Sequence, residues 1–296
     1  MSPTRFLESY TVMMSLGLVL GLLTGGFPWY TKEISMASLA LVMTLSLSAV
    51  RLGDAWGKDH IMHSLKALAV NYGMLTGLIL CIGLFFSEDY WIGWVLMAAA
   101  PSAISVVPFT TVLGGETSKA LFSTAVNYLA ALALMPLITL ILIGSSVSTA
   151  SLVYSLLLLI VLPMAASRIV MKAKISKPVN TSMMNFGFAV LIFAVTGANR
   201  DAFFAETMLV LLMSLGCILR TFGSGLGTEF ILRKAKVPKS SRITYVLFAS
   251  YKNLGLTATL AIALFVPEVA IPATLCIVFE VVWILFIIRY YPGVPE

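Results

Sequence analysis

The stretch FASYKNLGLTATLA, residues 248–261, carries Lys252 beside Asn253 in the middle of a long apolar run. Two other ionisable side chains, Arg220 and Glu280, lie inside similar runs. An ionised group is costly to bury in apolar surroundings unless a partner compensates its charge. These residue types offer three kinds of chemistry: pairing of a cation with a carboxylate, attraction of an anion, and carriage of a proton.

Composition identifies the surroundings of these residues. Apolar residues make up 59% of the 296 positions, charged residues make up 11%, and the mean hydropathy is +0.99. These values exceed what a soluble core requires and predict an integral membrane protein. Runs of about 20 apolar residues are long enough to span a bilayer, and in lipid they must be helices. The sequence divides into ten such runs, at residues 10–30, 35–51, 64–86, 90–113, 118–144, 149–170, 180–198, 204–231, 241–265 and 268–290.

Other residues with chemical potential indicate no metal and no cofactor. The three cysteines, Cys81, Cys217 and Cys276, fall in different spans and form no spaced pair, so we interpret them as core residues. His60 and His63 form an H-x-x-H pair at a loop edge, without a glutamate at the spacing of a metal site. The run at 10–30 predicts a first membrane helix in preference to a cleaved signal peptide.

Basic residues predict the orientation in the membrane. With ten spans, 15 of the 19 Lys and Arg residues fall on the side of the two termini, and only Lys32 and Arg200 fall on the other side. The positive-inside rule therefore predicts that both termini are cytoplasmic in an inner or plasma membrane. The pI near 9.2 follows from this topology and gives no reason to expect nucleic-acid binding.

The depth of each intramembrane charge follows from helix geometry. At a rise of about 1.5 Å per residue, Lys252 lies about 17 Å from the cytoplasmic start of its span and Glu280 about 18 Å from the outer start of its own. Both should lie near the midplane, and a Lys252–Glu280 pair is expected, either structural or part of a site. Arg220 lies nearer the cytoplasmic end and either snorkels or lines the same cavity.

The ten spans divide into two halves, which predict an inverted repeat. The polar stretch GSSVSTAS, residues 144–151, separates five spans from five, so residues 1–144 and 145–296 are predicted to be related units of opposite orientation. In span 4, AAAPSAISVVPF contains Pro101, Ser105 and Pro108, and prolines break or kink a helix. Pro101 and Lys252 each come 11 residues after the start of their spans. Helices 4 and 9 are therefore expected to break and to cross, with Ser250 and Tyr251 at the second break.

Three stretches carry a resemblance to a known family. They are ASLALVMTLSLSAVRLGD (37–54), APSAIS (100–105), and KNLGLTATLA (252–261) with IPATLCIVFE (271–280). In these the chain resembles the bile acid:sodium symporter family over nearly its whole length. The resemblance implies a panel of spans 1, 2, 6 and 7, a core of spans 3–5 and 8–10, and a substrate cavity beside the crossing. It also implies alternating-access transport of organic anions.

The sequence differs from the sodium-coupled members of this family at residues that those members share and that the resemblance assigns to a sodium site. Sodium-coupled members resemble each other in a Ser-Asn pair after the span 4 proline, where this chain has Val106 and Val107. Their span 9 motif Glu-x-Gly-x-Gln-Asn corresponds here to FASYKN, of which only Asn253 matches. Ser123 and Asn127 of span 5 match polar family positions but are too few to hold an ion. Sodium needs several oxygen ligands, which valine lacks, and an ammonium would repel it.

The sequence therefore predicts a secondary transporter of an organic carboxylate, not an enzyme, in which the Lys252 ammonium stands where relatives hold a sodium ion. Glu280 is its expected partner or a proton carrier, and coupling to a proton or to a counter-anion stays open. Sodium-coupled symport within the same family is the first alternative. A retinal Schiff-base protein is the second, although such proteins have seven spans. The sequence does not choose among sterol, keto and hydroxy acids as substrate.

Overall fold

The computed structural model describes residues 3–48, 57–144, 148–205 and 207–291, and every regular element in these ranges is a helix. Most of the described residues in each of the ten predicted runs are helical. Six helical segments of the described residues are long and apolar enough to cross a membrane: Lys58–Gly83, Thr117–Ile143, Thr149–Lys172, Lys177–Ala198, Thr207–Lys234 and Pro267–Tyr290. The predicted boundary after Gly144 adjoins residues 145–147, and the end of the 37–54 motif falls within 49–56; both lie outside the described residues.

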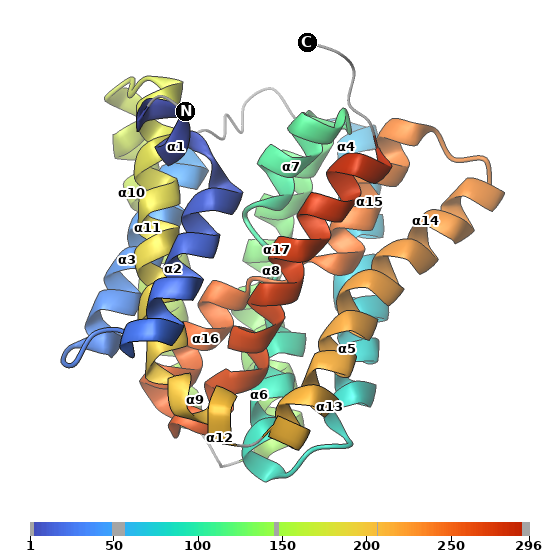
Figure 1. Cartoon of the computed structure of the whole chain (residues 1–296). Helices are drawn as coiled ribbons and strands as arrows, with labels where there is room; N and C mark the ends of the chain where they lie inside the picture. Colours follow the sequence, from blue (N-terminus) through green and yellow to red (C-terminus); the bar gives the residue numbers. More distant parts are fainter. Residues whose placement is uncertain (1–2, 49–56, 145–147, 206, 292–296) are drawn as a thin grey trace.

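One group of helices forms a layer at the left of Figure 1. It consists of α1 (Pro3–Glu8), α2 (Tyr10–Thr24), α3 (Thr31–Ser48), α9 (Thr149–Leu156) continuing through a π-helix η4 (Leu157–Val161) into α10 (Leu162–Lys172), and α11 (Lys177–Ala198). Helix α11 packs along α2 and α3, and α10 packs along α3. Gly17 allows the close approach of α2, because a Cβ there would clash with the Ala189 carbonyl of α11. We call this group the four-helix layer, counting the short α1 together with α2 and counting α9, η4 and α10 as one helix.

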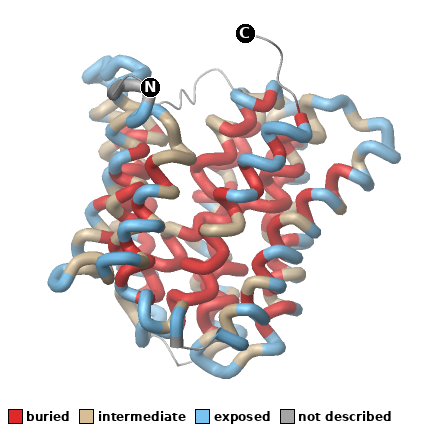
Figure 2. Tube along the Cα trace, in the orientation of Figure 1, coloured by how far each residue is buried: buried red, intermediate tan, exposed pale blue. Residues whose placement is uncertain are grey.

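The remaining helices form the main body. They are α4 (Lys58–Leu68), π-helix η2 (Ala69–Leu75), α5 (Thr76–Gly83), α6 (Glu88–Ala99), α7 (Val106–Leu113), α8 (Thr117–Ile143), α12 (Arg200–Ala205), α13 (Thr207–Ile218), π-helix η5 (Leu219–Gly223), α14 (Ser224–Lys234), α15 (Lys239–Ser250), α16 (Leu254–Leu264), the 3-10 helix η6 (Pro267–Ala270) and α17 (Ile271–Tyr290). Burial is concentrated where α6, α16 and α17 meet, and the surfaces facing outward are exposed (Figure 2).

The fourth and ninth predicted spans, residues 90–113 and 241–265, are interrupted where the sequence predicts. Helix α6 ends at Ala99, because the following Ala100 is extended before Pro101 and α7 begins only at Val106. Helix α15 ends at Ser250, and α16 begins after Asn253. The two extended segments run past each other through an antiparallel bridge between Ser102 and Lys252, and the Asn253 N–H donates to the Pro101 carbonyl at 2.8 Å.

Asn253 also starts the second half of its helix. Its side-chain Oδ1 accepts a hydrogen bond from the Leu256 N–H at 3.0 Å, which is the usual way in which asparagine caps a helix N-terminus. Its Nδ2 donates to the Tyr128 hydroxyl of α8 at 2.6 Å. The asparagine therefore fixes the break and ties it to a neighbouring helix.

A cluster around Glu116 joins the turn between α7 and α8 to α15. Lys119 donates to Glu116 Oε1 at 2.7 Å, Ser241 donates to Oε2 at 2.9 Å, and the Glu116 N–H donates to the Thr244 hydroxyl at 3.0 Å. Partial burial acts to raise the pKa of Glu116, but the hydrogen bonds from Lys119 and Ser241 and the charge of Lys119 outweigh it and hold the pKa below its ordinary value. The cluster ties the first broken helix to the second at one end of the main body.

The lowered pKa of Glu116 predicts a pH-dependent contribution to stability. A carboxyl whose folded-state pKa is depressed stabilises the fold above its ordinary value of 4.5 and loses this contribution as the pH falls through the folded value. We expect Glu116→Gln to lower the melting temperature of the detergent-solubilised protein near neutral pH. The difference from the unmodified protein should close as the pH falls below 4.5 and through the lowered pKa of the folded state. A difference that is unchanged at low pH would show that the carboxylate charge contributes nothing.

Candidate functional site

The Lys252 ammonium is enclosed by oxygen atoms at the crossing of the two broken helices. Its Nζ donates to Asn71 Oδ1 at 3.1 Å, to Thr76 Oγ1 at 3.0 Å, and to the carbonyls of Ala98 and Ala100 at 2.9 Å each. The Lys252 residue is fully buried. Because an ammonium has three protons, four acceptors leave none of its donors free.

Two features of the chain build this cage. Helix α6 ends at the crossing, so its last carbonyls are open and carry the negative end of the helix dipole toward the ammonium. The π-helix η2 of span 3 supplies Asn71, whose Nδ2 also donates to the carbonyls of Phe248 at 2.9 Å and Tyr251 at 3.3 Å. One side chain therefore contacts the lysine and the broken end of α15 together. The Lys252 Nζ also lies over the ring of Tyr72, 4.5 Å from the ring centroid, which is a cation–π contact.

Glu280 pairs with Arg220, which corrects the expected Lys252–Glu280 ion pair. Arg220 Nη2 and Nη1 lie 2.5 and 3.0 Å from Glu280 Oε1, and Nη2 also donates to the Ser250 carbonyl at 2.8 Å. Only the backbone N–H of Lys252 reaches Glu280, at 3.3 Å from Oε1. Arg220 is fully buried and does not snorkel. Depth along a helix placed Lys252 and Glu280 at one level but did not give the direction of the lysine side chain.

The two cations occupy corresponding places. Lys252 binds the open carbonyl end of α6, and Arg220 binds the open carbonyl end of α15. Both π-helices contact the open end of α15, because Asn71 of η2 donates to the Phe248 carbonyl and Arg220 of η5 donates to the Ser250 carbonyl. Short π-helical turns within longer helices are frequent at functional sites. Each broken helix therefore has a buried positive charge at its negative end.

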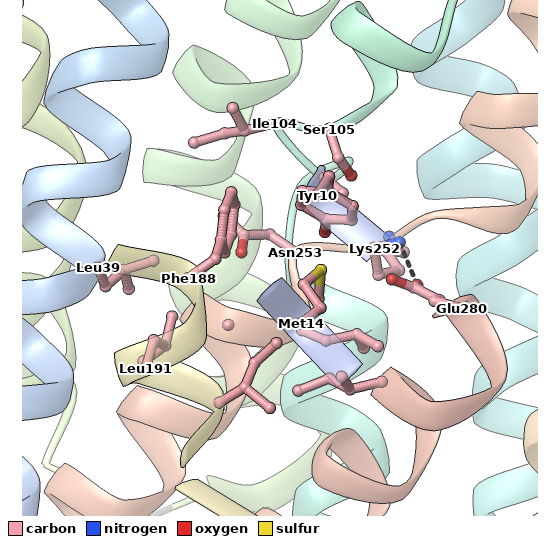
Figure 3. Close-up of a pocket in the computed structure, with 15 residues that line it drawn as sticks. Tyr10, Met14, Leu39, Ile104, Ser105, Phe188, Leu191, Lys252, Asn253 and Glu280 are labelled. Atoms are coloured by element: carbon pink, nitrogen blue, oxygen red, sulfur yellow. Dashed lines mark hydrogen bonds between the residues drawn. The ribbon is translucent and has the colours of Figure 1, made fainter. Parts of the chain in front are cut away.

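A small cavity lies between the crossing and the four-helix layer (Figure 3). Its volume is about 30 Å³, enough for about one water molecule. Ser105, Asn253 and Glu280 give it a polar wall, and Tyr10 and Phe188 of the four-helix layer give it an aromatic one. The dashed line in Figure 3 is the hydrogen bond from the Lys252 backbone to Glu280. In this conformation the space beside the crossing is too small for an organic acid.

The comparison with family models matches residues 34–205 to the sodium bile acid symporter family. This is more than half of the 296-residue chain. The chain belongs to the sodium bile acid symporter family. It is accordingly an integral membrane protein of a transporter family. The match includes the first broken helix and ends before Arg220, Lys252 and Glu280. The comparison with curated proteins gives no match.

The residues predicted for the site in the first broken helix of this symporter-family protein face two different places, the crossing and a second cavity. Pro101 supplies the carbonyl that binds Asn253, and Val106 is fully buried. Val107 and Pro108 line a second cavity of about 210 Å³, between α7, α8 and the four-helix layer. Val106 and Val107 therefore bring apolar atoms, and no oxygen ligand, to the start of the helix that follows Pro101.

The polar residues of span 5 have other partners. The Ser123 hydroxyl bonds His63 Nδ1 at 2.9 Å and the Ser64 hydroxyl at 3.0 Å, and Asn127 Nδ2 donates to the Ser123 carbonyl at 2.9 Å. Neither Ser123 nor Asn127 lines the cavity at the crossing, as far as the described residues show. These two residues give helix α8 polar contacts with α4 and with its own backbone.

Ser250 and Tyr251 hold the second break against α17. The Tyr251 hydroxyl donates to the Glu280 carbonyl at 3.0 Å, and the Trp283 indole N–H donates to the Ser250 hydroxyl at 2.9 Å. Sequence reasoning missed Asn71, Thr76 and Tyr128, which contact Lys252 and Asn253 directly. The available signal was their polarity inside apolar spans 3 and 5, a weaker signal than a charge.

Proposed function

We propose that this protein is a secondary transporter of an organic carboxylate that works by alternating access without sodium. The single observation that supports this most strongly is the oxygen cage around the Lys252 ammonium. Four oxygens, two of them open helix carbonyls, form the kind of surroundings that a bound monovalent cation requires. In this chain the cation is covalently attached to the protein.

A tethered cation takes over two tasks of a bound ion. It compensates the negative end of α6 at the crossing, and it makes the binding of a second cation there unfavourable by repulsion at short distance. The Arg220–Glu280 pair is close to neutral, so the crossing retains the one positive charge of Lys252. This charge favours an anionic substrate in the adjoining cavity.

The groups that would contact a carboxylate lie at the N-terminal ends of α7 and α16. Ser105 precedes α7 and Asn253 precedes α16, and both line the cavity of Figure 3. Helix N-termini carry partial positive charge and bind anionic groups, as in other transporters with interrupted helices. The substrate carboxylate is proposed to bind between these two ends.

The proposed architecture has ten membrane helices in two inverted repeats, residues 1–144 and 145–296, with both termini cytoplasmic. The four-helix layer is the panel of this arrangement, and the main body is its core. Close packing of α11 on α2 and α3 supports a panel that moves as a unit. Movement of the panel against the core would open the cavity at the crossing to either side in turn.

Coupling is proposed to depend on Glu280, because the ammonium of Lys252 is enclosed and Glu280 lines the cavity. A proton on Glu280 would accompany the carboxylate, giving symport; without it, the loaded site would cross only in exchange for another anion. Sodium-coupled symport is the remaining alternative within the family. The Schiff-base alternative is disfavoured, since retinal requires far more room than the cavity of about 30 Å³ beside Lys252.

We expect uptake of organic acids into proteoliposomes to be independent of sodium. Substrates are first found by thermal-shift screening of the purified protein against an organic acid library, with and without sodium. Uptake rates of a stabilising acid should then agree in sodium, potassium and choline media. Uptake that rises steeply with sodium and fails in choline would exclude the proposed role of Lys252 as the built-in cation.

A further inference from the structure

The two histidines of the H-x-x-H pair have no part in the proposed transport mechanism, and their surroundings differ. His60 Nε2 bonds the Ser118 hydroxyl at 3.2 Å in an exposed contact. His63 is only 5% exposed, and its ring stacks on the ring of Tyr245 from α15, with centroids 4.5 Å apart. Among the described residues no group of three His, Cys, Asp or Glu side chains is placed to hold a metal ion. His63 is therefore a buried imidazole whose partners need a different explanation.

The hydrogen bonds around His63 determine which ring nitrogen carries a proton. The Ser64 hydroxyl donates its single proton to the His60 carbonyl at 2.8 Å. The hydroxyls of Ser64 and Ser123 lie 3.0 Å apart, so Ser123 must be the donor in that contact. Ser123 Oγ also lies 2.9 Å from His63 Nδ1, and with its own proton used it can only accept there. This order alone gives every contact a proton, and it assigns the proton of the neutral ring to Nδ1.

The other ring nitrogen, Nε2, is then a bare acceptor that faces a carboxylate. It is buried and has no hydrogen-bond partner among the described residues, and it lies 3.7 Å from Glu116 Oε2. A lone pair and a carboxylate repel each other, whereas a proton on Nε2 converts the contact into an ion pair. Burial and the neighbouring positive charges oppose an imidazolium, and the carboxylate favours it. The titratable or charged groups that act on the ring are Glu116, Lys119 of α8, His60 and Lys66 of α4, and Tyr245 of α15.

We propose that His63 Nε2 and the Glu116 carboxylate form a proton-binding site, separate from Glu280, at the end of the main body where α4, α8 and α15 begin. Neither residue lines the cavity at the crossing or the second cavity. The Glu116 carboxylate already accepts hydrogen bonds from Lys119 of α8 and Ser241 of α15. A proton on His63 brings α4 into the same network, so the junction between span 3 and the two broken helices becomes stronger as the pH falls. This site does not depend on the proposed function.

Nuclear magnetic resonance of the histidine ring tests the site without measuring transport. The chain has two histidines, so His60→Gln leaves His63 as the only one, and it retains the backbone carbonyl that Ser64 binds. The protein is labelled with carbon-13 and nitrogen-15 histidine, purified without a histidine tag and reconstituted into lipid bilayers. We expect a protonated Nδ1 and a bare Nε2 near pH 8, and a proton on Nε2 as the pH is lowered toward about 4. A ring with its proton on Nε2 at high pH, or a ring that stays neutral until the protein unfolds, would overturn the site.

Neutralising the carboxylate should weaken proton binding. Glu116→Gln in the same background should lower the proton affinity of His63 Nε2 at least about fivefold, the factor that one unit charge at about 4 Å exerts even in water. Glu268→Gln removes an exposed carboxylate from η6 and is the matched control, which should leave the affinity unchanged. Equal affinities in the two variants would show that Glu116 is not part of the site.

A third variant tests the assigned order of hydrogen bonds and also serves if Glu116→Gln does not fold. Ser123→Ala removes the acceptor of the Nδ1 proton, so the proton of the neutral ring should move to Nε2, where the Glu116 carboxylate accepts it. Ser118→Ala removes a hydroxyl from the same helix that does not contact His63, and it should leave the proton on Nδ1. A proton that stays on Nδ1 in Ser123→Ala would refute the assignment. None of these results bears on sodium dependence, so this proposal and the proposed function fail separately.

Discussion

Replacing Lys252 with alanine is expected to reduce transport at least about 100-fold while the protein stays folded. The substitution removes a buried cation from four acceptors, among them the carbonyls of Ala98 and Ala100. A buried acceptor left without a partner costs about 1–3 kcal/mol, and a cost of about 2.8 kcal/mol in the transport cycle is about 100-fold in rate or affinity. The measurement is proteoliposome uptake of an acid selected by thermal shift, with size-exclusion chromatography as the check on folding.

A tethered cation should be replaceable by a free one. Propylammonium has the three carbons and the ammonium that Lys252→Ala lacks, so we expect it to restore part of the lost uptake, whereas 1-propanol should not. Lys252→Met fills the space without charge and should resist rescue by either compound. Rescue by sodium alone would indicate that the cage accepts a bare ion once the lysine is removed. Normal uptake in Lys252→Ala would show that the lysine is dispensable for transport.

The helices were predictable from the sequence because lipid makes long apolar runs helical. Prolines and the SYKN stretch located both interruptions, since each departs locally from an apolar helix. Span ends were less accurate. Helix α4 begins at Lys58, although hydropathy placed the span from residue 64, because polar first turns extend beyond the hydrocarbon-like run. Hydropathy measures burial in lipid and does not detect the hydrogen bonds that define a helix end.

The location of Lys252 at the crossing was predictable, but its partners were not. Depth along a helix comes from counting residues, whereas the direction of a side chain depends on rotation about the helix axis and on the π-helices η2 and η5. No sequence signal marked these turns. The shapes of the two cations also explain which partners each of them binds. The planar fork of Arg220 reaches a carboxylate and a carbonyl together, while the ammonium of Lys252 suits a cage of oxygens.

Glu280 is expected to carry the coupled proton, and Glu280→Gln should remove the dependence of uptake on a pH gradient. Among the described residues, all hydrogen bonds to this carboxylate fall on Oε1, from Arg220 and from the Lys252 backbone. Oε2 is therefore available for a proton, and Glu280 lines the cavity. One pH unit is worth about 1.4 kcal/mol per proton, so proton symport would accumulate substrate up to about tenfold. Glu280→Gln should not accumulate it.

The Glu280→Gln variant leaves Arg220 buried without a counter-charge, which could prevent folding for a reason unrelated to coupling. The double variant Arg220→Met with Glu280→Gln removes both charges and should restore stability, because apolar replacement of a whole buried pair is often neutral or stabilising. It should remain insensitive to the pH gradient. Glu116→Gln, which changes a carboxylate outside the cavity, is the control and should keep pH-driven uptake.

Substrate preloaded inside the vesicles tests anion exchange as the other mode of coupling. If the unmodified protein takes up labelled substrate only by exchange, the proton has no role. Accumulation driven by a pH gradient in the double variant would show that the proton is carried elsewhere.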